Sequence, residues 1–96
     1  MQRQLRIYTI QPAAMDQWVY VWKHLVKPLR KKMGFKIERA WTVEKTNQFI
    51  WVMSHEGPES WEKYDQAYHE SVERRSLAPD PYRFIQGIEN QFVDTL

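Results

Sequence analysis

Cysteine is absent from this sequence of 96 residues, and glycine occurs only three times. The lack of cysteine excludes disulfides, thiolate nucleophiles and cysteine-ligated zinc or iron–sulfur sites, and it favours a cytoplasmic protein. There is no glycine-rich phosphate loop, and no serine lies in the Gly-x-Ser-x-Gly turn of serine hydrolases. We therefore expect neither nucleotide binding through such a loop nor serine hydrolysis.

Long apolar runs and an excess of one charge are also missing. The longest apolar run, Phe49–Met53, has five residues, whereas a membrane-spanning helix needs about 18. The net charge of +2 is too small to indicate binding to nucleic acid or to an anionic membrane. Residues 1–7 have the pattern of neither a signal peptide nor a transit peptide. We expect one soluble domain over residues 1–96, with no nucleic-acid or membrane partner.

Metal-ligand motifs are absent as well. The three histidines form no His-x-His or His-Glu-x-x-His pattern, and no cluster of carboxylates accompanies them. We therefore expect neither a metal nor a cofactor. His24 falls off the apolar stripe of its helix and is expected at the surface, whereas His69 borders a stripe and could reach into a cleft.

What the sequence does contain is a regular succession of strand and helix patterns. Residues rich in β-branched and aromatic side chains predict strands over 5–10, 35–44, 49–55 and 89–96. Apolar residues at intervals of three and four predict helices over 15–33 and 58–75, the second with a stripe of Trp61, Tyr64, Tyr68 and Val72. Pro28 predicts a kink or a break in the first helix. Residues 45–47 fit a hairpin turn, and Asp80 fits the cap of a short extra turn over 82–85.

The predicted order is β-α-β-β-α-β, an α+β ferredoxin-like fold. In this fold a four-stranded antiparallel sheet carries two helices on one face. In the third strand, Phe49, Trp51 and Met53 share one face, yet Ile50 and Val52 occupy the other. Because the helices cover only one side, we expect a second copy of the chain to cover the other, which makes the protein a homodimer.

The chain also resembles the NIPSNAP family over most of its length. In the first half the resemblance rests on residues 6–12, Trp22, Pro28, residues 34–35 and residues 41–44. In the second half it rests on residues 47–48, residues 78–81 and Phe84. The resemblance implies a dimeric α/β barrel, in which two sheets pack face to face with their helices outside. It implies a fold rather than a reaction, because most members of this group have no established activity.

Aromatic residues are abundant, with five Trp, five Tyr and four Phe. We interpret them as the lining of a pocket between sheet and helices that takes a small hydrophobic or aromatic molecule. The expected walls are Tyr8, Trp22, Trp41, Trp51 and Tyr68, with His55 or Arg39 as the polar tip. Arg39 is a candidate because it interrupts the alternation of apolar residues between Ile37 and Trp41, and a guanidinium there needs a partner.

Two other interpretations remain open. The aromatic residues could only fill the core and the dimer interface, in which case the protein is a structural or interaction module. Related dimeric barrels also include monooxygenases, some independent of cofactors and some using haem. The haem-degrading kind relies on an asparagine in the first strand, and residues 5–10 contain none.

Overall fold

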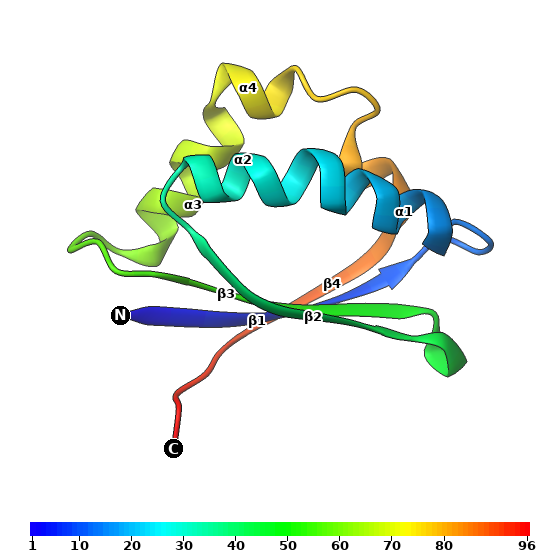
Figure 1. The fold of residues 1–96 in the computed structure, drawn as a ribbon, viewed down its shortest axis with the longest axis horizontal. Coiled ribbons are helices and arrows are strands. Elements are labelled where there is room, and N and C mark those ends of the chain that lie inside the picture. Colours follow the sequence, from blue (N-terminus) through cyan, green and yellow to red (C-terminus); the bar gives the residue numbers. More distant parts are fainter.

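The computed structural model describes residues 1–96, which fold into a four-stranded sheet with helices on one side (Figure 1). The strands are β1 (Gln2–Ile10), β2 (Lys36–Val43), β3 (Gln48–His55) and β4 (Ile85–Phe92). The helices are α1 (Met15–Val21), α2 (Lys27–Lys32), α3 (Trp61–Glu70) and α4 (Val72–Arg75), with a π-helical segment η1 (Trp22–Val26) between α1 and α2. Short 3-10 turns lie at Glu44–Thr46 and Pro81–Phe84. No helix has both the length and the apolar character needed to cross a lipid bilayer.

The sheet has the strand order β2-β3-β1-β4, and all of its pairs are antiparallel. This arrangement confirms the predicted ferredoxin-like fold. Leu5 lies opposite Val52 and Ile7 opposite Ile50 on the face away from the helices. That face, which we call the open face, also carries Trp41, which lies opposite Ile50. It is covered by no helix in the single chain (Figure 1).

The core lies between the helices and the other face of the sheet. Trp18 of α1 packs edge-on against Tyr8 and Phe49, in each case with 5.6 Å between ring centroids. Trp22 packs edge-on against Trp51 at the same distance. All five rings are at most 4% exposed. Such edge-to-face pairs add to the stability gained from burying the rings.

Contrary to the prediction from the sequence, the helix neither kinks sharply nor breaks at Pro28, but changes its hydrogen bonding to a π-helical turn just before it. The backbone N–H of Lys27 donates to the carbonyl of Trp22, five residues earlier. Pro28 then lies in the first turn of α2, where its missing N–H removes no bond from the new helix. The chain continues along one axis across this turn (Figure 1).

The second predicted helix starts at Trp61 rather than at Pro58 and is interrupted at Ser71, although helix is again present up to Arg75. α3 begins at Trp61 because the Ser60 side chain caps it by accepting a hydrogen bond from the N–H of Lys63. It ends at Glu70, where the extended backbone of Ser71 separates it from α4. Val72 therefore leaves the apolar stripe and is 66% exposed. The short turn after Asp80 is present at Pro81–Phe84, but the last strand starts directly after it, at Ile85 rather than at residue 89.

The predicted alternation in β2 is also wrong, because the strand contains a bulge. The register with β3 shifts between Ile37 and Arg39, which leaves Glu38 as an extra residue. Ile37 pairs with Met53 on the helix side, whereas Trp41 pairs with Ile50 on the open face. Trp41 is consequently 45% exposed, and Arg39 is exposed on the open face, where it lies opposite Val52, rather than on the helix side.

Candidate functional sites

The seven residues predicted to line one pocket lie in separate places. Trp22, Arg39 and Trp41 border a groove at the edge of β2. Trp51 is 1% exposed within the aromatic core, and Tyr8 and Tyr68 are buried next to two arginines. His55 lies at the rim of the core.

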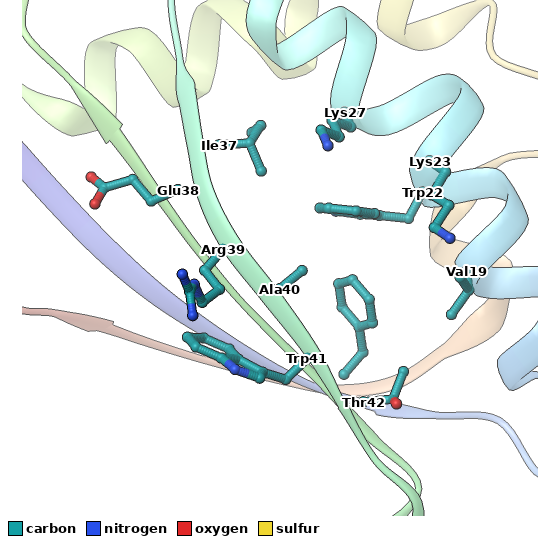
Figure 2. A pocket seen from close by; sticks show the side chains of 11 residues that line it. Val19, Trp22, Lys23, Lys27, Ile37, Glu38, Arg39, Ala40, Trp41 and Thr42 are labelled. Carbon is teal, nitrogen blue, oxygen red and sulfur yellow. The ribbon is translucent and has the colours of Figure 1, made fainter.

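The groove at the edge of β2 has a volume of about 400 Å³ (Figure 2). Its floor is formed by the helix-side face of β2, where Ala40 and Thr42 leave room because their side chains are small. We call it the β2-edge groove, and its lining consists of Val19, Trp22, Lys23, Lys27, Ile37, Glu38, Arg39, Ala40, Trp41, Thr42 and Phe49. Its helical wall comes from the end of α1, from η1 and from the first residue of α2, so the π-helical turn at Trp22 shapes it directly.

The positive charge inside this groove belongs to lysines rather than to Arg39. The ammonium of Lys27 lies 5.6 Å from the centroid of the Trp22 ring, close enough for a cation–π contact. Figure 2 shows Arg39 and Trp41 on the opposite side of β2 from Trp22 and Lys27. Glu38 also points away from the groove and pairs with Arg3, with 2.8 Å between Oε2 and Nε.

His55 makes structural contacts through one ring face and Nδ1. It stacks on Tyr64 with ring centroids 3.6 Å apart, and its Nδ1 accepts a hydrogen bond of 3.0 Å from the N–H of Gly57. A Cβ atom at Gly34, whose φ is +94°, would lie only 2.9 Å from the Nε2 atom of His55. The half-buried ring is therefore held between Tyr64, Gly57 and Gly34, and His55 lines none of the larger pockets.

A second candidate site is a buried group of charges that the sequence did not reveal. Arg30 of α2 donates from Nη1 to Oδ1 of Asp65 on α3 at 2.8 Å, and Nη1 of Arg6 on β1 lies 3.6 Å from the same oxygen. The side chains of Arg6 and Arg30 are 4% and 2% exposed. We call these three residues, together with His69, Tyr82 and Asn90, the arginine cluster.

Neighbouring rings and amides hold the arginine cluster in place. The guanidinium carbon of Arg30 lies 3.6 Å from the centroid of the Tyr68 ring, a close cation–π contact. Nε of Arg6 donates to Oδ1 of Asn90 at 3.1 Å. The Tyr82 hydroxyl and Nε2 of His69 lie 3.1 Å apart and share a hydrogen bond.

Burial and charge set the protonation states of this cluster. Burial alone would raise the pKa of Asp65, but the nearby guanidinium groups of Arg30 and Arg6 outweigh it and hold that pKa below its ordinary value. For His69, burial comes first and the surrounding arginines add to it, so the pKa falls to about 4 despite the attraction of Asp65. At neutral pH the cluster therefore contains two cations, one anion and a neutral imidazole.

Comparison with known proteins identifies the family. The family model described as NIPSNAP matches residues 3–95. The chain belongs to the NIPSNAP family. No curated protein matches the sequence.

Solved structures share the fold of this NIPSNAP chain at low sequence identity. An uncharacterized NIPSNAP domain protein from Burkholderia xenovorans has a TM-score of 0.84 at 10% identity, and the alignment covers 100% of this chain and 95% of that one. A NIPSNAP family protein from Agrobacterium tumefaciens has a TM-score of 0.85 at 12% identity, covering 99% and 92%. A protein described as an antibiotic biosynthesis monooxygenase has a TM-score of 0.68 at 16% identity, covering 100% and 99%. These similarities establish the ferredoxin-like fold and no activity.

Proposed function

We infer that this NIPSNAP protein is a homodimer that binds a small hydrophobic or aromatic molecule in the β2-edge groove. The observation that carries this proposal is the groove itself. Its volume of about 400 Å³ is within the range of small-molecule sites, which is roughly 300–1,000 Å³. Trp22 and Phe49, whose rings are otherwise buried, form part of its apolar wall with Val19 and Ile37, and Lys23 and Lys27 add positive charge.

The groove can be tested by filling it. Ala40 is half-buried on the floor beside the aromatic core, so Ala40→Phe places a ring inside the groove. Naphthol serves as a neutral aromatic probe, with binding followed by calorimetry and by NMR of the Ala40 and Thr42 methyl groups. We expect the native protein to bind naphthol with shifts of these methyl signals, and Ala40→Phe to weaken binding by about tenfold or more.

The matched control is Ala67→Phe, which introduces the same ring at an exposed position of α3. It should bind naphthol as the native protein does. Naphthol binding that is absent, or that survives Ala40→Phe unchanged, would refute the groove as a ligand site. The protein would then be better described as a structural module whose aromatic residues only fill the core.

A monooxygenase-type reaction is the second candidate function. It is favoured by one observation, the fold shared with a protein described as an antibiotic biosynthesis monooxygenase. Oxygen uptake on addition of a dihydroxynaphthalene, abolished by Ala40→Phe, would support oxidation in the β2-edge groove. Binding without oxygen uptake would leave the protein as a binding module.

A further inference from the structure

The arginine cluster has more hydrogen-bonding capacity than its protein partners use. Arg6 and Arg30 are the two most deeply buried cations, at 3% and 2% exposure. Nη1 of Arg6 and Nε of Arg30 are both buried, and neither has a hydrogen-bond partner. Buried polar atoms in proteins are nearly always paired, so each unpaired donor requires an explanation.

The cluster also has more positive than negative charge. Asp65 supplies the only carboxylate that pairs with either Arg6 or Arg30, and it uses one oxygen, Oδ1, for both. His69 adds no charge at neutral pH, since its pKa is about 4. Arg74 pairs with Asp80, at 3.2 Å between Nη2 and Oδ1, so these two cancel. One positive charge is left over, and a single negative charge would neutralise it.

The helix-side face of β4 brings exposed side chains next to Arg6. The register places Asn90 opposite Arg6 in the sheet, with Ile88 opposite Tyr8 and Phe92 opposite Gln4. Asn90 is exposed, and Ile88 and Phe92 are 46% and 57% exposed although they lie on the face that the helices cover elsewhere. The amide oxygen of Asn90 accepts the hydrogen bond from Nε of Arg6, as a carboxylate oxygen from solvent could.

We propose that Arg6 and Arg30 bind the carboxylate group of a small monocarboxylate whose apolar part lies on Ile88 and Phe92. The ligand displaces the amide of Asn90, which is free to swing outward because β4 is an edge strand. Its carboxylate takes the place of the Asn90 oxygen on Nε of Arg6 and brings a negative charge to a cluster in which Nη1 of Arg6 and Nε of Arg30 lack partners, a role that arginine geometry suits. The site is at the β4 edge of the sheet, whereas the β2-edge groove is at the opposite edge, so the two are independent.

Two substitutions at one exposed position test the proposal. Asn90→Asp supplies a carboxylate from the protein itself, which pairs with Arg6 and competes with the ligand. Asn90→Ala removes the competing amide and leaves the donors free. With hexanoate as the probe and calorimetry as the measurement, we expect Asn90→Asp to weaken binding by about tenfold or more and Asn90→Ala to tighten it. If Asn90 had only a structural role, both substitutions would change the affinity for hexanoate in the same direction.

Three controls make the result decisive. Hexanol has the same chain without the charge and should not bind at concentrations where hexanoate does. Arg6→Met should abolish hexanoate binding, and if it does not fold, the Asn90 pair still answers the question. Ala40→Phe, which fills the β2-edge groove, should leave hexanoate binding unchanged. No hexanoate binding at millimolar concentration, equal binding by the two Asn90 variants, or loss of binding in Ala40→Phe would each overturn the proposal.

Discussion

At the residue scale, the pKa of His69 reflects the burial and the charges of the arginine cluster. Its pKa falls from 6.5 to about 4 in the folded protein, mainly because burial disfavours the imidazolium and also because Arg30, Arg74 and Arg6 repel it. Between these two pH values the unfolded chain binds a proton that the folded chain does not. Stability therefore decreases as the pH drops from 6.5 to 4, by about 3 kcal/mol for a shift of this size.

This pH dependence can be measured by urea unfolding between pH 7 and pH 4. His69→Gln can still hydrogen-bond the Tyr82 hydroxyl but does not titrate, so the decrease should be largely absent from it. Asp65 interferes little, because its pKa lies below the ordinary value of 3.8. The stability that its carboxylate contributes is therefore lost mainly below pH 4. The same pH dependence in His69→Gln would show that another group is responsible.

The sequence predicted individual site residues poorly, and the cluster explains why. Arg6 shares the helix-side face of β1 with Tyr8 and Ile10, and this alternation could have indicated that it is buried. Arg30 belongs to the basic run at residues 27–32, a pattern typical of a solvated helix end. Its burial depends on Tyr68 and Asp65 of α3, contacts that no pattern within α2 can reveal.

At the element scale, the π-helical turn predicts how the protein tolerates Pro28. A proline inside a regular α-helix costs about 3 kcal/mol, but here the shifted hydrogen bonds place Pro28 in the first turn of α2. Pro28→Ala should therefore raise the free energy of unfolding by less than about 1 kcal/mol in urea titrations. A gain close to 3 kcal/mol would show that the proline strains the helix.

Element types followed from the sequence, whereas the faces of β2 and the ends of α3 did not. All four strands and both main helical regions occur in the predicted order, because burial on one face imposes that periodicity, although β4 lies at Ile85–Phe92 rather than over residues 89–96. The bulge at Glu38 changed the side on which Trp41 and Arg39 lie, since one extra residue reverses the alternation. A bulge has no periodic pattern of its own, and this single residue separated the predicted polar tip from the pocket.

At the scale of the whole molecule, the open face provides the test for a homodimer. Leu5, Ile7, Ile50 and Val52 form adjacent apolar pairs at its centre, each still partly exposed in the single chain. Burying them against a second copy should remove at least about 1,200 Å² of surface in total. Light scattering should give a dimer mass at micromolar concentration, and Val52→Lys should give a monomer or an unfolded chain because it buries an unpaired charge.

The matched control for this substitution is Gln17→Lys, which adds the same charge at an exposed position of α1. It should remain a dimer. A monomer mass for the native protein would mean that the open face has another partner or none. The sequence alone indicated this face, because Ile50 and Val52 alternate with core residues in a strand whose other side the helices cover.

Strand β2 contributes residues both to the proposed ligand groove and to the proposed dimer interface. Its helix-side residues Ala40 and Thr42 form the floor of the groove, while Trp41 between them lies on the open face. If a ligand in the groove shifts Trp41 enough to strengthen the dimer, the dimer must bind that ligand more tightly than the monomer by the same factor, because such coupling is reciprocal. Measuring naphthol affinity above and below the concentration at which the dimer dissociates would give the coupling free energy directly. The protein would then sense its ligand through the edge strand that the groove and the open face share.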